Sequence, residues 1–167
     1  MDNFVITIAR GYGSGGKTIG KMLAKELNID FYDRELLRLA SDDSGINERL
    51  FAKSDEKVKG TLLFKAARKV YNGELIPPDS DDFVSNDNLF NYQAKVMKEL
   101  ADTESCVIVG RCADFVLKEY KHVIKIFVHA PMDYCISNVV DLYGLSRKEA
   151  EKRILSTDKI RAEYYLH

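Results

Sequence analysis

The chain has 167 residues, and its 25 Lys and Arg residues nearly balance 26 Asp and Glu residues, for a formal net charge of −1. This balance excludes the strong basic field of a typical nucleic-acid-binding protein, so we expect no nucleic acid partner. The length suits a single domain over residues 1–167, and no apolar run approaches the roughly 18 residues of a membrane span, so we expect no membrane partner.

Residues 4–9 (FVITIA) are apolar and rich in β-branched side chains, which predicts the buried central strand of a parallel sheet. Residues 11–18 (GYGSGGKT) then meet every fixed position of the phosphate-binding pattern G-x-x-x-x-G-K-[ST]. The apolar residues that follow recur at helical spacing and predict one buried helix face: Ile19, Met22, Leu23 and Leu27. Strand, loop and helix arrive in the order that nucleotide-phosphate binding requires, although an ordinary glycine-rich turn is the alternative.

The residue types in this loop suit a polyphosphate. Main-chain N–H groups can wrap phosphates only where side chains stay away and some residues adopt positive φ, as glycine does. Lys17 can reach the β and γ oxygens as a mobile point charge, and the Thr18 hydroxyl is placed to bind Mg²⁺. The glycines expected to form the cradle are Gly11, Gly13, Gly15 and Gly16.

The next elements form a short strand and a helical insertion. Residues 29–33 predict a strand that ends in Asp33, after a helix stop at Asn28. A helix from residue 34 is expected to break at residues 41–45.

Two short helices are expected over residues 46–73, a proline-containing loop over 76–82, and a long helix over 88–101. The second short helix carries Lys65, Arg68 and Lys69, which either approach an anionic ligand or form a solvated face. We expect the helical insertion, residues 34–104, to build the acceptor side of the site.

Residues 106–110 (CVIVG) predict another buried strand, followed by Arg111. Ligands of open α/β sheets bind outside the carboxyl ends of the strands, so Arg111 is expected at the same edge as the phosphate loop. Arginine suits bidentate capture of a phosphate. The alternative is a surface arginine paired with Asp114.

The last part of the chain predicts a fourth strand over residues 123–128, a helix that begins at Pro131 and ends at Gly144, and a final helix that begins with the capping box of Ser146 and Glu149. That final helix carries Arg153 and Arg161, eight residues and about two turns apart, so both can face one ligand. A salt-bridged, exposed helix explains the spacing equally well.

Three cysteines, Cys106, Cys112 and Cys135, form no C-x-x-C pair and are odd in number, which fits a reducing cytosol. We expect a cytoplasmic protein in which all three are small core residues.

Three blocks of the sequence together resemble the cytidylate-kinase-like family of P-loop nucleoside monophosphate kinase relatives. They are ITIARGYGSGGKTIGKMLAKELNIDFYDRELL, CVIVGRCADFVL and YGLSRKEAEKRILSTDKIRAEYY. The resemblance implies an α/β fold of the P-loop NTPase type, three layers with a parallel sheet of four or five strands and a helical insertion between strands 2 and 3. It also implies a kinase that uses ATP and Mg²⁺ to phosphorylate a nucleoside monophosphate such as CMP or dCMP.

The resemblance also assigns roles. Donor phosphates would lie on Gly11, Gly13, Ser14, Gly15, Gly16, Lys17 and Thr18. Arg111 matches the arginine that holds the acceptor phosphate, and Asp33 matches an acidic residue after the second strand. We also expect Asp114 among the residues that bind the acceptor. Asp158 and Arg161 match a D-x-x-R pair that meets the acceptor's sugar and phosphate, and Arg153 falls among the lid arginines. The lid-like region is residues 145–167.

Departures from the family pattern are also visible. Val109 stands where cytidylate kinases have an acidic residue, so acceptor recognition must differ in detail. No metal-binding Asp ends the third strand, which leaves Asp114, Asp33 or water to complete the Mg²⁺ shell. The family's further C-terminal strand and helix are expected to be missing.

Other functions remain open at this stage. A non-catalytic nucleotide-binding module and a P-loop kinase of another small molecule share the same loop. Residues 42–45 fit the D-x-x-G pattern of a GTP-hydrolysing switch, but they follow a helix and no N-K-x-D motif exists.

Overall fold

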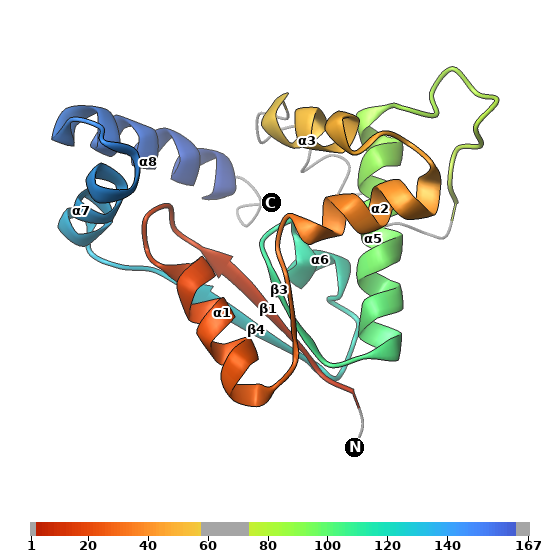
Figure 1. The fold of residues 1–167 in the computed structure, drawn as a ribbon, viewed down its shortest axis with the longest axis horizontal. Helices are drawn as coiled ribbons and strands as arrows, with labels where there is room; N and C mark the ends of the chain where they lie inside the picture. The colour runs from red at the N-terminus through yellow and green to blue at the C-terminus, as the bar shows by residue number, and fades with distance from the viewer. Residues whose placement is uncertain (1–2, 58–73, 163–167) are drawn as a thin grey trace.

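A computed structural model describes residues 3–57 and 74–162 of the chain (Figure 1). Its sheet has four parallel strands in the order β2-β3-β1-β4, so β1 is central, as expected. Their bounds are β1 (Val5–Arg10), β2 (Asp30–Tyr32), β3 (Cys106–Val109) and β4 (Val123–Val128). The parallel α/β sheet with a helical insertion between the second and third strands is confirmed.

Seven helices occur within the described residues: α1 (Gly16–Leu27), α2 (Glu35–Ser44), α3 (Glu48–Lys57), α5 (Asn86–Thr103), α6 (Ala113–Val116), α7 (Met132–Tyr143) and α8 (Arg147–Ala162). α1 covers one face of the sheet, and α5 and α6 lie on the other with α2 and α3 beside them, which gives three layers (Figure 1). α7 and α8 form a hairpin at the other end of the molecule from α2 and α3 (Figure 1).

Alternation along the strands divides the core into two layers. Ile6 and Val107 point toward α1, whereas Val5 and Ile108 belong to the cluster with the insertion helices. Both kinds of position are fully or nearly fully buried on β3 and from Val5 to Ile8 of β1, because helices cover both faces of a parallel sheet.

The predicted buried face of α1 is wrong in part. Ile19, Met22 and Leu27 are 45%, 66% and 43% exposed. The helix instead buries Gly16, Gly20 and Ala24. A Cβ on Gly20 would lie 3.0 Å from Cδ1 of Ile8, so small residues let α1 approach the sheet closely. The larger apolar side chains are left on the flanks of this contact.

The insertion differs from expectation at one point. α2 continues through residues 41–44 and ends at Gly45 in the left-handed conformation, so the break expected over residues 41–45 occurs only at its last residue. Arg38, paired with Glu35 and Asp42 along the helix, supports this continuation. The second expected short helix, with Lys65, Arg68 and Lys69, lies outside the described residues.

The C-terminal hairpin follows the expected signals. α7 begins after Pro131 and ends at Gly144 with φ of 64°. The Glu149 carboxylate accepts a hydrogen bond from the Ser146 main-chain N–H, and the Ser146 hydroxyl accepts one from the Glu149 N–H. This reciprocal pair is the predicted capping box. The Ser146 hydroxyl also donates to the Glu149 carboxylate, and this bond, followed by the one from the Ser146 main-chain N–H, lowers the pKa of Glu149.

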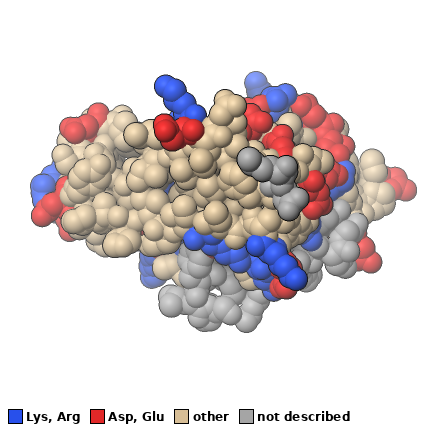
Figure 2. Space-filling view, turned by 90° about the horizontal axis from the view of Figure 1, so that it is seen from below, with Lys and Arg blue, Asp and Glu red and all other residues tan. Residues whose placement is uncertain are grey.

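Cys106 and Cys135 are buried as expected, whereas Cys112 is only partly buried and packs against the edge of the core. Within the described residues, no helix is long and apolar enough to cross a membrane. On the face shown in Figure 2, Lys and Arg side chains lie in several separate groups, the largest of them along the lower edge of the view.

Candidate active site

The glycine-rich loop joins the carboxyl end of β1 to the first turn of α1, at the carboxyl edge of the central strand. Gly13 and Gly15 have φ of 80° and 85°, conformations that glycine adopts without a steric penalty. No side chain caps the start of α1 at Gly15. The first-turn amides of α1 therefore have no side-chain acceptor, as a helix that receives a phosphate requires.

Neighbouring groups hold the loop in this shape. The Asn138 side-chain amide of α7 donates a 2.8 Å hydrogen bond to the Gly13 carbonyl oxygen. A Cβ on Gly13 would lie 2.7 Å from the Cys135 carbonyl oxygen, so the loop rests directly on the backbone of α7. The buried Ser14 hydroxyl donates to the Gly11 carbonyl oxygen at 2.8 Å, so this hydroxyl supports the loop from within.

Asp33 connects the phosphate loop to the turn after β3. Its carboxylate lies 2.6 Å from Nζ of Lys17. Its main-chain carbonyl oxygen accepts a 3.0 Å hydrogen bond from Nε of Arg111. The Asp33 side chain is 16% exposed and that of Lys17 is 55% exposed, so the pair opens to solvent on the lysine side.

The turn that carries Arg111 has an unusual backbone. Gly110, Arg111 and Cys112 have φ of 76°, 55° and 55°. Left-handed conformations cost a non-glycine residue roughly 1–2 kcal/mol, and such strain is often found at ligand-binding positions. Nη1 of Arg111 also donates to the side-chain oxygen of the buried Gln93 at 3.3 Å. The guanidinium is thus held from two sides, by the residue that follows β2 and by α5.

The end of α8 packs against the first residues of the loop. The Tyr12 main-chain N–H donates to the Asp158 carboxylate at 2.7 Å, and Nη1 of Arg161 donates to the Arg10 carbonyl oxygen at 3.0 Å. The Arg153 guanidinium carbon lies 4.6 Å from the ring centre of Tyr143 and 5.6 Å from that of Tyr12. Both distances are typical of cation–π contacts.

The two tyrosine rings are themselves stacked, with centres 6.4 Å apart. Burial, and then the hydrogen bond with Tyr143, raises the pKa of Tyr12, so its hydroxyl stays protonated at neutral pH. The Arg161 guanidinium also lies over Tyr12, 5.5 Å from the ring centre. Tyr12 is therefore the point where α7, α8 and the phosphate loop meet.

Most of the predicted site residues come together at this edge. The loop, Lys17, Asp33 and Arg111 are joined through Asp33, while Arg153, Asp158 and Arg161 reach the loop through Tyr12 and Arg10. Asp158 contacts the loop itself, and its expected role toward the acceptor sugar stays a prediction. Asp114 lies in the first turn of α6, three residues after Arg111.

The described residues at this edge fit a magnesium site that has few protein ligands. Thr18 is exposed in the first turn of α1, where its hydroxyl is accessible. The described residues contain no cluster of three or more His, Cys, Asp or Glu side chains that would hold a metal by themselves. Mg²⁺ commonly binds through substrate phosphates, waters and few protein ligands, so Thr18 is compatible with such a site.

Sequence reasoning missed several residues at this edge. Gln93, Asn138 and Tyr143 contact the site from helices far along the chain from the loop. No local motif marks them. Gln93 is a polar residue among the apolar positions on the buried face of α5. Such a polar residue at a core position is the signal in the sequence that points to it.

Comparisons with known proteins agree with this fold. The model of the cytidylate kinase-like family matches residues 5–167. Among solved structures, an uncharacterized protein from Eubacterium ventriosum matches with a TM-score of 0.64 and 24% identity, covering 99% of this chain and 78% of the other. At that identity the likeness shows the fold alone. No curated protein matches the chain.

Proposed function

The chain belongs to the cytidylate kinase-like family, and we propose that it transfers the γ-phosphoryl group of ATP to a nucleoside monophosphate, with CMP and dCMP as the first candidates. The family suggests a nucleotide-kinase-like function. The identity of the acceptor is our proposal.

The observation that carries this proposal is the position of Asp33 between two cations. One belongs to the phosphate loop and the other to the turn after β3, and Asp33 contacts Lys17 through its carboxylate and Arg111 through its carbonyl oxygen. A phosphotransferase needs one set of cations for the donor and another for the acceptor, close enough for direct transfer. The link through a single residue supports such a pair of subsites.

On the donor side, the amides of the loop and of the first turn of α1 are the groups that would bind the ATP phosphates. Lys17 would neutralise the charge on the β and γ phosphates, for which it must leave Asp33. Thr18 would contribute its hydroxyl to Mg²⁺, which when bound neutralises phosphate charge. These roles fit the uncapped helix start and the exposed Thr18.

On the acceptor side, Arg111 would bind the phosphate of the monophosphate. Its Nε and Nη1 atoms bond to Asp33 and Gln93. These two bonds fix the plane of the guanidinium. A guanidinium of fixed orientation loses little further conformational entropy when it binds two phosphate oxygens. Asp33 and Asp114 remain candidates for contacts with the rest of the acceptor.

The α8 arginines would complete the site. Arg153 and Arg161 lie beside the loop, where positive charge stabilises the phosphoryl group during transfer. The acceptor is already an anionic nucleophile, so the reaction needs no general base. The residues of this chain thus contribute positioning and charge neutralisation.

An ATP-consumption assay over a panel of nucleoside monophosphates tests the proposal. The parent protein is expected to turn over at least one of them in the presence of Mg²⁺. Lys17→Ala is expected to lower kcat by about a hundredfold or more, because it removes a charge that acts on the transferred group. Arg111→Ala is expected chiefly to raise the acceptor KM, by roughly tenfold.

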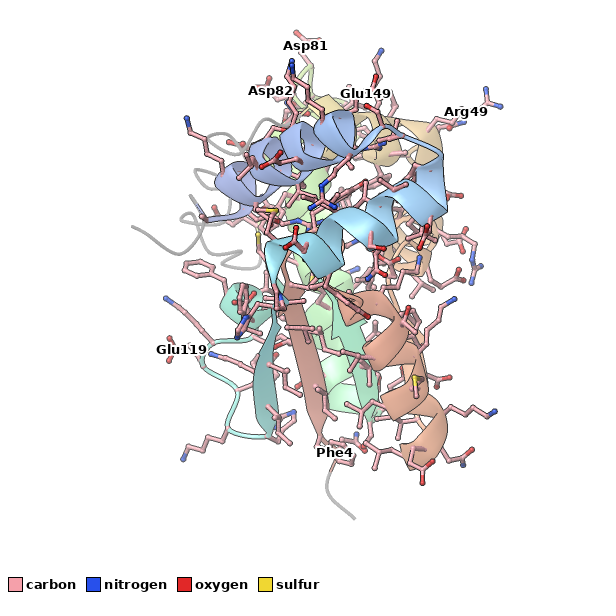
Figure 3. All side chains as sticks on the ribbon, turned by 90° about the vertical axis from the view of Figure 1, so that its left-hand side faces the viewer. Phe4, Arg49, Asp81, Asp82, Glu119 and Glu149 are labelled. Carbon is pink, nitrogen blue, oxygen red and sulfur yellow. The ribbon has the colours of Figure 1, made fainter. Side chains whose placement is uncertain are left out.

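Arg49→Ala serves as the control, because Arg49 projects into solvent from α3, away from the sheet (Figure 3). It should leave both constants unchanged. ATP binding without turnover of any acceptor would favour a non-catalytic nucleotide-binding module. Turnover of shikimate or dephospho-coenzyme A would favour a kinase of another small molecule, and a strong preference for GTP with hydrolysis would favour the switch.

A further inference from the structure

We propose that Arg10 is a further phosphate-binding residue and that its guanidinium contacts the γ-phosphate of the bound donor. This inference rests on the proposed function for its ligand, a nucleoside triphosphate. Arg10 is the last residue of β1 and is half-buried at the carboxyl edge of the central strand. The sequence pattern leaves it unassigned, between the apolar strand and the first glycine of the loop.

The first observation concerns Gly16 in the phosphate loop. A Cβ on Gly16 would lie 2.6 Å from Cβ and 3.0 Å from Cγ of Arg10. Gly16 is not among the glycines with positive φ, so its backbone does not by itself require glycine. What excludes a side chain at Gly16 is the stem of Arg10, which runs across the start of α1.

The second observation concerns Gly110 in the turn after β3. A Cβ there would lie 2.1 Å from Nη1 of Arg10 and 2.9 Å from the guanidinium carbon. The head of the arginine therefore rests on the bare backbone of Gly110. The side chain spans the distance from the phosphate loop to the turn that carries Arg111.

The two glycines have one property in common. Gly16 directly precedes Lys17, the cation of the donor subsite, and Gly110 directly precedes Arg111, the cation of the acceptor subsite. The Arg10 stem passes the first and its guanidinium reaches the second. In a direct transfer the group between donor and acceptor is the γ-phosphoryl group, so this is the phosphate that the guanidinium would meet.

The charges around Arg10 favour an anionic ligand. Arg161 bonds to the Arg10 carbonyl oxygen, and Lys17 and Arg111 lie next to the two glycines. Among the described carboxylates of this edge, Asp33 pairs with Lys17 and Asp158 accepts from the Tyr12 amide. A guanidinium is suited to a phosphate here because its fork matches two phosphate oxygens.

The position of the guanidinium predicts a difference between ATP and ADP. A contact with the γ-phosphate is lost with ADP, so Arg10 should matter for ATP alone. A hydrogen bond to a charged group corresponds to roughly a ten- to hundredfold change in affinity. Binding of each nucleotide can be measured without any turnover.

The test compares ATP and ADP affinities by titration calorimetry with Mg²⁺ for the parent, Arg10→Met and the control Arg49→Met. Methionine keeps an unbranched stem over Gly16 and removes the guanidinium. We expect Arg10→Met to weaken ATP binding at least tenfold and ADP binding less than twofold, with Arg49→Met unchanged for both. Thermal unfolding of each variant reports whether the fold is retained.

A second variant keeps the test decisive if Arg10→Met does not fold. Arg10→Lys keeps the stem and the charge but loses the planar fork, and it should weaken ATP binding about three- to tenfold, again without a comparable effect on ADP. Unchanged ATP affinity in the folded variant would overturn the inference. Equal losses for ATP and ADP would also overturn it, because they would mean that Arg10 only shapes the loop.

The outcomes separate this inference from the proposed function. If the parent turns over no acceptor while Arg10→Met selectively loses ATP, the kinase proposal fails and the γ-phosphate contact stands. If acceptors are turned over and Arg10→Met binds and phosphorylates like the parent, the kinase proposal stands and the role of Arg10 fails. A parent protein that binds no ATP would overturn both.

Discussion

Asp158 of α8 accepts a 2.7 Å hydrogen bond from the main-chain N–H of Tyr12, which joins the last described helix to the phosphate loop across 146 positions of the chain. Arg161, one turn further along α8, donates to the carbonyl oxygen of Arg10 at the start of the same loop. Side chains of α8 therefore form hydrogen bonds with both a main-chain N–H and a main-chain carbonyl oxygen at the start of the loop. A movement of α8 would therefore change the backbone conformation of the loop.

From this contact we expect Asp158→Ala to weaken ATP binding by about tenfold, because the Tyr12 amide loses a charged acceptor and the loop loses its fixed shape. Asp158→Asn keeps an oxygen in place and should lose less. Calorimetry gives the affinities. If both variants bind ATP normally while the acceptor KM rises, Asp158 acts on the acceptor sugar, as the family resemblance implies.

The ion pair of Lys17 and Asp33 must open when Lys17 binds phosphate. We expect Asp33→Asn to bind ATP about threefold more tightly, since an ion pair that is open to solvent on the lysine side contributes up to about 1 kcal/mol and the variant no longer has to break it. The same variant should be slower in transfer, because Asp33 also faces the acceptor side. An ATP affinity that falls in Asp33→Asn would show that the carboxylate orients Lys17 for the donor instead of competing with it.

Local signals in the sequence were sufficient for the central strand, the loop, the helix stops at Asn28 and Gly144, and the capping box. Each of these depends on residues within a few positions of one another, as with Ser146 and Glu149 or with Gly144 after α7. The edge of the sheet at which Arg111 lies followed from a general rule on parallel strands. These features could therefore be predicted without any contact information.

Features that depend on distant contacts could not be predicted. Hydrophobic periodicity pointed to Met22 as buried, but Gly20 and its close approach to Ile8 decide which side of α1 faces the sheet. Likewise Gln93 reaches Arg111 from α5, and Arg10 passes between two glycines about a hundred positions apart. The spacing of residues in the sequence does not indicate which distant residues are in contact.

Gly13 and Gly45 offer a matched test of how tightly the loop packs on α7. Both have positive φ, but a Cβ on Gly13 would meet the Cys135 backbone at 2.7 Å, whereas a Cβ on Gly45 would have open space. Gly45→Ala should cost about 1 kcal/mol for its conformation alone. Gly13→Ala should cost roughly 1–3 kcal/mol more, because backbone must move. Urea unfolding measures both, and equal losses would contradict the close packing.

We expect the buried thiol of Cys106 to make the folded protein less stable at alkaline pH. Burial, and then the charge of Glu104, raises the pKa of its thiol to about 12. Because the folded pKa is above that of the unfolded chain, the thiol is protonated in both states at neutral pH and ionises first in the unfolded state. Its contribution to the free energy of unfolding is therefore complete below about pH 8.5 and decreases as the pH rises toward 12.

Cys106→Ala removes this titration while it leaves the neighbouring Tyr32 and Glu104 in place. The variant should be less stable than the parent at pH 7.5, because a buried side chain becomes smaller. Between pH 7.5 and 10 the difference should shrink by roughly 1–2 kcal/mol, since only the parent loses the thiol contribution. Urea unfolding at several pH values measures this change, and two parallel curves would show that the buried thiol has no part in the alkaline loss.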